Sequence, residues 1–404
     1  MCVQWLRARL FGAKYVLGLL FCFSKVLLGM PAYTWYGYPY MYFDPRPKTR
    51  REDLYDRERE LERFLSALPY ASLIVITGLR RTGKTSFLNV ALAESGHPCA
   101  VLDLRGLPYN PSRADIVRRL EDAFNKVDRK WFSGLCEGLR RLRGVSILGN
   151  AVSFEWGKKG VDLPELFGKV DAWASEKKRR FLMAFDEIQL VRGDKGIPRL
   201  FAHIVDSYRN LTLVVTGSEV GVLFDFLGFD DAGSPLYGRH FVQIHMGNFS
   251  ASEAEEFLTL GFQQVGLAAP SEVIDYAVRN LDGVAGWLTL FGARCRDKHG
   301  CSKEIVDEVV SEGGKLAREE AVKLTVMSRR YGVILNFLAK VGSASWGEIK
   351  GVIEAKEKRS VTNSAVSNLL NTLVKVGVVE KADGKYGVVD ALLVSGIRRE
   401  ALPE

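Results

Sequence analysis

A glycine-bracketed loop directly after an apolar run constrains this chain more than any other feature. Residues 71–77 read ASLIVIT, an apolar run rich in β-branched side chains, which is typical of a strand buried on both faces. The next residues, GLRRTGKT at 78–85, match the pattern GxxxxGK[ST], and SFLNVALAES after them has helical periodicity. A strand, this loop and a helix in succession predict a phosphate-binding loop in an α/β domain.

Each residue type in this loop has a chemical reason to be there. Gly78 and Gly83 allow backbone N–H groups to curl around phosphate oxygens, and the helix N-terminus adds positive potential. Lys84 can reach the β- and γ-phosphates, while the Thr85 hydroxyl is a hard oxygen ligand for Mg²⁺. The predicted nucleotide-binding residues are consecutive: Gly78, Leu79, Arg80, Arg81, Thr82, Gly83, Lys84, Thr85 and Ser86.

A second apolar run ends in two acids. FLMAFDEIQ at 181–189 places Asp186 and Glu187 at the end of a predicted strand. Strands often end in acids, but downstream of a phosphate-binding loop a functional reading is favoured. We expect Asp186 to position Mg²⁺ through water and Glu187 to be the general base that orients the attacking water.

Two further residues are candidates for sensing the terminal phosphate. LVVTGS places Ser218 at the carboxyl end of the next strand, where ligands bind in open α/β sheets. SPLYGRHF places Arg239 just before another strand, from which an arginine could act in cis or reach a neighbouring subunit. An ordinary turn at Ser218 and a structural ion pair at Arg239 are the alternatives.

The rest of the chain supports a parallel sheet followed by helical domains. Runs at 98–106 and 240–247 read as strands, and 50–61 reads as a charged amphipathic helix. Residues 131–160 are irregular, with a hairpin-like excursion in VSILGNAVSFEWG, and 250–328 has helical periodicity throughout. After about 329, three short helices and a hairpin with a DG turn predict a winged helix-turn-helix.

The winged helix and the net charge both raise the question of DNA. The chain holds 56 Lys and Arg against 48 Asp and Glu, a formal charge of +8, which favours an anionic partner or simply a solvated basic face. The predicted recognition helix at 361–376 presents polar groups suited to base edges or phosphates, and a basic run precedes it. The polar groups are Asn363, Ser364, Ser367, Asn368 and Asn371, and the basic ones are Lys356, Lys358 and Arg359.

Cysteines and the amino terminus bear on location. The six cysteines lack CxxC spacing and there are five histidines, so we expect no metal cluster and a reduced, cytoplasmic environment. The apolar stretch at 15–30 follows basic residues. It has three interpretations: a start codon assigned too early, with Met30 or Met41 as the true start, a membrane anchor, or a secretory signal.

These stretches together resemble the archaeal-type ATPase family, a branch of the STAND and AAA-related P-loop NTPases. Family members carry a GxRRxGKTSL-like loop, an apolar strand ending in DE, a TGS strand end and a PLYGR-like stretch. Here these read GLRRTGKTSF, FLMAFDEIQ, VVTGSEVGVL and SPLYGRHF. The segment at 43–61 resembles one that lies against the adenine in the family. Unlike relatives with a GGxP turn, this chain reads LDGVAGWL, and its first 30 residues have no expected counterpart.

The resemblance implies ATP as ligand and an ASCE-type P-loop core, a parallel α/β sheet with a helical lid and a C-terminal winged helix. The expected domains are an N-terminal extension at 1–42, the ATPase core at 43–249, the lid at 250–328 and the winged helix at 329–404. One hypothesis is an Mg²⁺-dependent ATPase that switches the winged helix. The alternatives are a DNA-binding regulator that holds ATP structurally, a winged helix that docks another protein, and, more weakly, a nucleic-acid motor. An oligomer is compatible with each.

Overall fold

The computed structural model describes residues 41–404 except 109–110, 150 and 158–159. The apolar stretch at 15–30, with its three interpretations, lies outside the described residues. Within the described part of the chain, no helix is both long and apolar enough to cross a bilayer.

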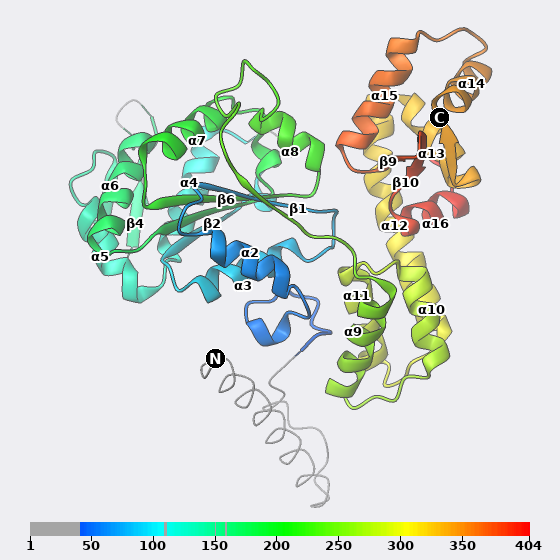
Figure 1. The fold of residues 1–404 in the computed structure, drawn as a ribbon, viewed down its shortest axis with the longest axis horizontal. Coiled ribbons are helices and arrows are strands. Elements are labelled where there is room, and N and C mark those ends of the chain that lie inside the picture. Colours follow the sequence, from blue (N-terminus) through cyan, green and yellow to red (C-terminus); the bar gives the residue numbers. More distant parts are fainter. Residues whose placement is uncertain (1–40, 109–110, 150, 158–159) are drawn as a thin grey trace, which may run out of the picture. The chain divides into compact units, whose positions relative to one another are not determined.

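A five-stranded parallel sheet forms the first large domain (Figure 1). Its strand order is β2-β5-β6-β1-β7, and every neighbouring pair runs parallel. The strands are β1 (Leu73–Thr77), β2 (Cys99–Asp103), β5 (Phe181–Asp186), β6 (Leu211–Gly217) and β7 (Val242–His245). Each lies in a run that the apolar pattern predicted as a strand. Strand β6 lies between β1 and β5, and all three strands run in the same direction. The loops that follow these three strands therefore lie side by side at one edge of the sheet.

Helices cover both faces of this sheet because side chains alternate along each strand. Leu73 and Val75 of β1 belong to the core under α4 to α8, whereas Ile74 and Ile76 belong to the core under α2 and α3. The first set of helices is α4 (Arg113–Asn125), α5 (Arg129–Leu139), α6 (Leu163–Glu176), α7 (Gly196–Ser207) and α8 (Val220–Leu227). The second set is α2 (Glu58–Ala67) and α3 (Lys84–Ser95). Both faces are therefore buried, as continuous apolar strands require.

The irregular region at 131–160 is more ordered than its composition indicated. Helix α5 occupies its first part, and an antiparallel hairpin of β3 (Val145–Leu148) and β4 (Ala151–Phe154) confirms the predicted excursion. The capping box expected at Ser112 and Asp115 is also present at the start of α4.

The single helix predicted at 50–61 is wrong. A short 3-10 helix, η1 (Arg51–Asp53), is separated from α2 by Asp56 and Arg57, which have φ of +56° and +74°. The buried Arg57 turns inward, donates to the Gly247 carbonyl oxygen at 2.7 Å and lies over the Phe249 ring. These tertiary contacts break a helix that local propensity favours.

A helical domain and a winged helix follow the sheet (Figure 1). The first consists of α9 (Ala251–Gln264), α10 (Ser271–Leu281), α11 (Ala285–Asp297) and the beginning of α12 (Lys303–Met327). The second contains α13 (Arg329–Val341), β8 (Ser343–Ser345), α14 (Trp346–Glu357), α15 (Asn363–Lys375), β9 (Val379–Ala382), β10 (Lys385–Val388) and α16 (Ala391–Arg399). Two more 3-10 turns, η2 (Leu104–Gly106) and η3 (Ile188–Val191), follow β2 and β5.

Helix α12 joins the two helical cores. Ile305 and Val309 pack in the first core, and Ala317 and Ala321 pack in the second. Helix α16, which no sequence pattern predicted, lies along α12 at a close crossing of glycines. A Cβ atom added to Gly396 would lie 2.2 Å from the Gly314 carbonyl oxygen.

Candidate functional site

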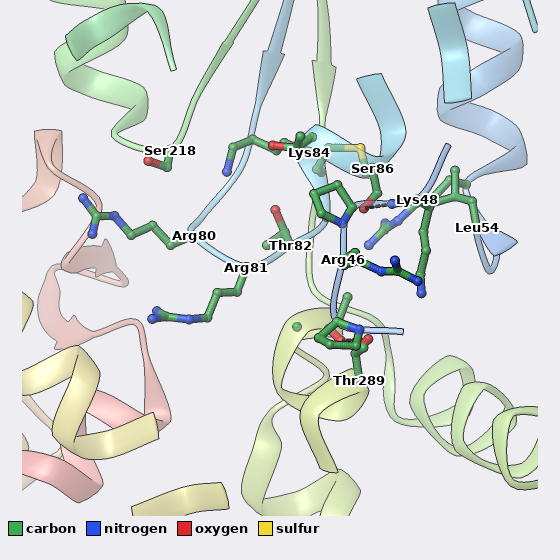
Figure 2. A pocket seen from close by; sticks show the side chains of 18 of the residues that line it. Arg46, Lys48, Leu54, Arg80, Arg81, Thr82, Lys84, Ser86, Ser218 and Thr289 are labelled. Atoms are coloured by element: carbon green, nitrogen blue, oxygen red, sulfur yellow. Dashed lines mark hydrogen bonds between the residues drawn. The ribbon is translucent and has the colours of Figure 1, made fainter. Parts of the chain in front are cut away.

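A cavity of about 610 Å³ opens among the P-loop (residues 78–85), the segment 42–57 and helix α11 (Figure 2). Figure 2 shows Arg80 and Ser218 on one side of it and Arg46, Lys48 and Leu54 on the other. The cavity is within the size range of small-ligand sites. It lies where loops leave the carboxyl ends of the strands, as expected for an α/β sheet.

The P-loop has the backbone shape that the two glycines predicted. Gly78 has φ of +152°, and a Cβ atom there would lie 2.3 Å from the Met246 carbonyl oxygen, so no larger residue fits without a shift. Gly83 has φ of +91° and directly precedes α3. Lys84, Thr85 and Ser86 form the first turn of α3 and line the cavity. The N–H groups of a first helical turn have no partner within the helix, which favours an anion there.

Lys84 is buried and is folded against its own loop. Its Nζ atom donates to the carbonyl oxygens of Gly78 and Leu79 at 3.0 and 2.7 Å. Burial lowers the pKa of Lys84, although the carboxylates of Asp186 and Glu187 oppose this shift. A bound phosphate chain would offer this amine a stronger, charged partner than the two carbonyls.

The two predicted metal ligands are in direct contact. The Thr85 hydroxyl donates to Asp186 Oδ2 at 2.9 Å, and the Thr216 hydroxyl donates to Asp186 Oδ1 at 2.6 Å. Asp186 is only 1% exposed, and burial raises the pKa of its carboxyl group. A buried carboxylate beside a hydroxyl suits a hard divalent cation, so these residues fit Mg²⁺.

Glu187, the predicted base, is held by three donors. Its Oε2 atom accepts from the Ser218 N–H at 3.1 Å, the Ser218 hydroxyl at 2.8 Å and Gln189 Nε2 at 2.5 Å. The residue has φ of +60°, which aims its side chain at the end of β6. Ser218 thus lines the cavity, as predicted, and in this structure its polar groups bind the candidate base.

The remaining P-loop residues connect the loop to other parts of the chain. Thr82 donates to the Leu79 carbonyl oxygen, and Ser86 accepts from the backbone of Lys48. Arg80 forms ion pairs with Glu219 and Glu320. Arg81 also approaches Glu320, at 3.7 Å, and lies over the Trp287 ring of α11 at 4.3 Å.

Arg239 lies apart from these residues. It forms an ion pair with Asp206 of α7 at 2.6 Å and is not among the residues that line the cavity. Within one chain, Arg239 therefore has the geometry of a structural ion pair, which was the alternative to a phosphate-sensing role. A role toward a neighbouring subunit stays a prediction.

Arg105, Gln189 and Glu320 are among the residues that line this cavity and that sequence reasoning missed. Arg105 follows β2, whose Asp103 pairs in register with Asp186 of β5. Because ligands bind at the carboxyl ends of strands in open α/β sheets, its position after a predicted strand could have marked Arg105 as a candidate. Glu320 lies on α12, far along the chain, and no local pattern indicated it.

The segment 42–57 contributes both charged and apolar side chains to the lining of the cavity. Leu54, Phe249 and Phe257 line it together with Tyr42. Lys48 holds this segment in shape, because its Nζ atom donates to the carbonyl oxygens of Met41, Tyr42 and Asp44 at 2.7 to 3.0 Å. Apolar and aromatic side chains in the same cavity as the P-loop suit the base of a nucleotide whose phosphates lie at the loop.

The fold and the site define a P-loop ATPase with a C-terminal winged helix. The model of the family "ATPase domain predominantly from Archaea" matches residues 54–291, more than half of the chain, and the chain belongs to that family. A second model, the C-terminal winged helix-turn-helix domain of MCM proteins, matches residues 326–389.

One solved structure supports the same assignment, and a second shows weaker similarity. The Walker-type ATPase PABY2304 of Pyrococcus abyssi is 30% identical, with a TM-score of 0.75 over 89% of this chain and 100% of that one. Cdc6p of Pyrobaculum aerophilum aligns over 89% of this chain and 98% of its own, at 13% identity and a TM-score of 0.44. A search of curated proteins finds no match. The protein is thus a nucleotide-binding ATPase, as the P-loop and the resemblance predicted.

Proposed function

We propose that this ATPase uses ATP and Mg²⁺ to switch its winged helix, and that the winged helix binds double-stranded DNA. One contact carries the proposal. A Cβ atom added to Gly377, just after α15, would lie 3.4 Å from Leu79 Cδ2 and 3.8 Å from the Ser218 carbonyl oxygen. The end of the predicted recognition helix therefore meets both the P-loop and the residue that holds Glu187.

The roles in hydrolysis follow from the geometry. Lys84 would leave its two carbonyl partners to bind the phosphates, while Thr85 and Asp186 would hold the metal. The chemistry that Mg²⁺ would supply when bound is neutralisation of the negative charge on the phosphates. Ser218 and Gln189 occupy the Oε2 atom of Glu187, so Glu187 would orient a water through its other carboxylate oxygen or after releasing one of these donors.

A second set of contacts links the P-loop to α12. Glu320 is paired with Arg80 at 2.9 Å and lies 3.7 Å from Arg81, both in the loop that would surround the phosphates. Phosphate oxygens would compete with Glu320 for these guanidinium groups. Because α12 packs into the winged-helix core through Ala317 and Ala321, a change at Glu320 would reach the winged helix.

The case for DNA rests on one face of α15. Ser364, Asn368 and Asn371 are exposed and lie at spacings of four and three residues, which places them on one side of the helix. The basic run is partly neutralised, since Lys356 pairs with Glu404 and Arg359 with Glu357. We therefore expect Lys358 to contribute more to phosphate binding than its two neighbours.

Duplex binding in different nucleotide states tests the proposal. Fluorescence anisotropy of a labelled duplex should show affinity that falls with salt, by roughly one unit of log-log slope per phosphate neutralised. Affinity should also differ between ADP and a non-hydrolysable ATP analogue, by about 1–3 kcal/mol. Lys358→Ala should weaken binding on every sequence, whereas Lys298→Ala, whose lysine pairs with Glu308 on the helical domain, should not.

Two results would redirect the assignment. If no duplex is bound at low salt in either nucleotide state, the winged helix is a docking surface for another protein. If DNA is bound equally in both states, the regulator that holds ATP structurally is the better description.

A further inference from the structure

Arg105 lies against the two residues that would hold the metal. Its Nη2 atom is 3.3 Å from Asp186 Oδ2, and its Nη1 atom is 3.5 Å from Thr85 Oγ1. Thr85 donates to the same Asp186 oxygen. The guanidinium group therefore approaches the oxygens that a divalent cation would need.

This position is set by the neighbouring strand. Asp103, the residue opposite Asp186 in the sheet register, accepts two hydrogen bonds from the Arg105 guanidinium group, Nε to Oδ1 at 2.8 Å and Nη2 to Oδ2 at 2.7 Å. The Arg105 side chain is nonetheless 46% exposed. It can leave Asp186 without opening the hydrophobic core.

The negative charge of Asp186 explains why a basic side chain lies at this position. A buried carboxylate such as Asp186 needs a compensating cation. Lys84, the nearest alternative, is bound to the Gly78 and Leu79 carbonyl oxygens. Among the described residues, Arg105 is the basic group in ion-pair contact with Asp186.

We propose that Arg105 is a displaceable counter-cation of the metal site. It neutralises Asp186 in the metal-free protein and gives up Asp186 and Thr85 when Mg²⁺ enters with nucleotide. Two cations at one carboxylate oxygen repel each other, so metal binding and the Arg105 contact are mutually exclusive. The inference rests on the proposed metal ligands and adds a competitor to them.

The test is the Mg²⁺ requirement for binding of a fluorescent ADP analogue, measured by titrating Mg²⁺ at fixed nucleotide. Arg105→Gln should lower the half-saturating Mg²⁺ concentration by roughly tenfold, as expected when one nearby like charge is removed. Arg105→Lys keeps the charge and should stay near wild type. Arg113→Gln is the control, because Arg113 forms a surface pair with Asp194 away from the cavity.

The outcomes separate this inference from the proposed function. If Arg105→Gln binds ADP with an unchanged Mg²⁺ requirement, the counter-cation role is wrong and the metal ligands stand. If Arg105→Lys lowers the requirement as much as Arg105→Gln does, charge is not the cause and the inference fails. If wild-type protein shows no Mg²⁺-dependent ADP binding, the proposed metal site itself is wrong.

Discussion

At the scale of single residues, we expect Lys84 to exchange its hydrogen-bond partners when nucleotide binds. Its amine is buried and bound to two carbonyl oxygens of its own loop. Lys84→Ala should abolish tight ATP binding, because the β- and γ-phosphates lose a fixed positive charge. Isothermal calorimetry measures this, with Lys303→Ala, a surface lysine of α12, as control. Equal ATP affinity in Lys84→Ala and wild type would contradict the phosphate-binding role of the loop.

Glu187 gives a prediction about turnover instead of binding. Glu187→Gln preserves shape but removes the base, so ATP should bind while the hydrolysis rate falls by about 10²-fold or more. Phosphate release and nucleotide affinity, measured together, separate the two effects. Glu137→Gln on the surface of α5 should change neither. An unchanged rate in Glu187→Gln would mean that the base lies elsewhere.

Gln189 allows a separate test of the candidate base, because its side chain donates a hydrogen bond to Glu187. It is 1% exposed, and its Oε1 atom finds no hydrogen-bond partner among the described residues. Gln189→Ala removes one of three donors to Glu187 and should alter kcat more than ATP affinity. Equal loss of ATP affinity and kcat would instead indicate general damage to the site.

At the scale of elements, the α12–α16 crossing depends on glycine. A Cβ atom at Gly396 would lie 2.2 Å from the Gly314 carbonyl oxygen, so Gly396→Ala forces the two helices apart. We expect a loss of about 1–3 kcal/mol in the free energy of unfolding, as for overpacked cores. Thermal or denaturant unfolding measures it.

Gly351 of α14 is the control for this substitution. A Cβ atom there meets nothing within 4 Å, so Gly351→Ala should be neutral or stabilising by up to about 1 kcal/mol, through helix propensity. If both variants behave alike, the close crossing does not limit the packing of α16.

At the scale of the whole molecule, Glu320 links the P-loop to the helix that carries the winged helix. Glu320→Gln should leave ATP binding largely intact but reduce the difference in DNA affinity between nucleotide states, because Arg80 and Arg81 lose their shared acid. The control is Glu312→Gln, which lies on the same helix as Glu320 and breaks a surface ion pair with Arg294 of α11. Full coupling in Glu320→Gln would indicate that the Gly377 contact, and not Glu320, connects the nucleotide site to the winged helix.

Local sequence patterns were enough to predict the strands of the sheet, the P-loop, the acids at the end of β5 and the winged helix. Each of these depends on a local pattern: apolar runs for buried strands, glycine spacing for the loop and helical period for the domains. Caps were equally local, as Ser112 shows. The resemblance to archaeal-type ATPases then added the nucleotide and the family, which the comparisons bear out.

The contacts between side chains that lie far apart along the chain could not be predicted from the sequence and depend on the folded arrangement. Glu187 is bound to Ser218, Arg105 approaches Asp186, and Arg239 faces Asp206 away from the cavity. The break before α2 likewise follows from the inward turn of Arg57. The physical reason is that an arginine or a carboxylate satisfies its charge with whichever opposite group the fold brings within a few ångströms. That partner is set by strand order and helix packing, and not by neighbours along the chain.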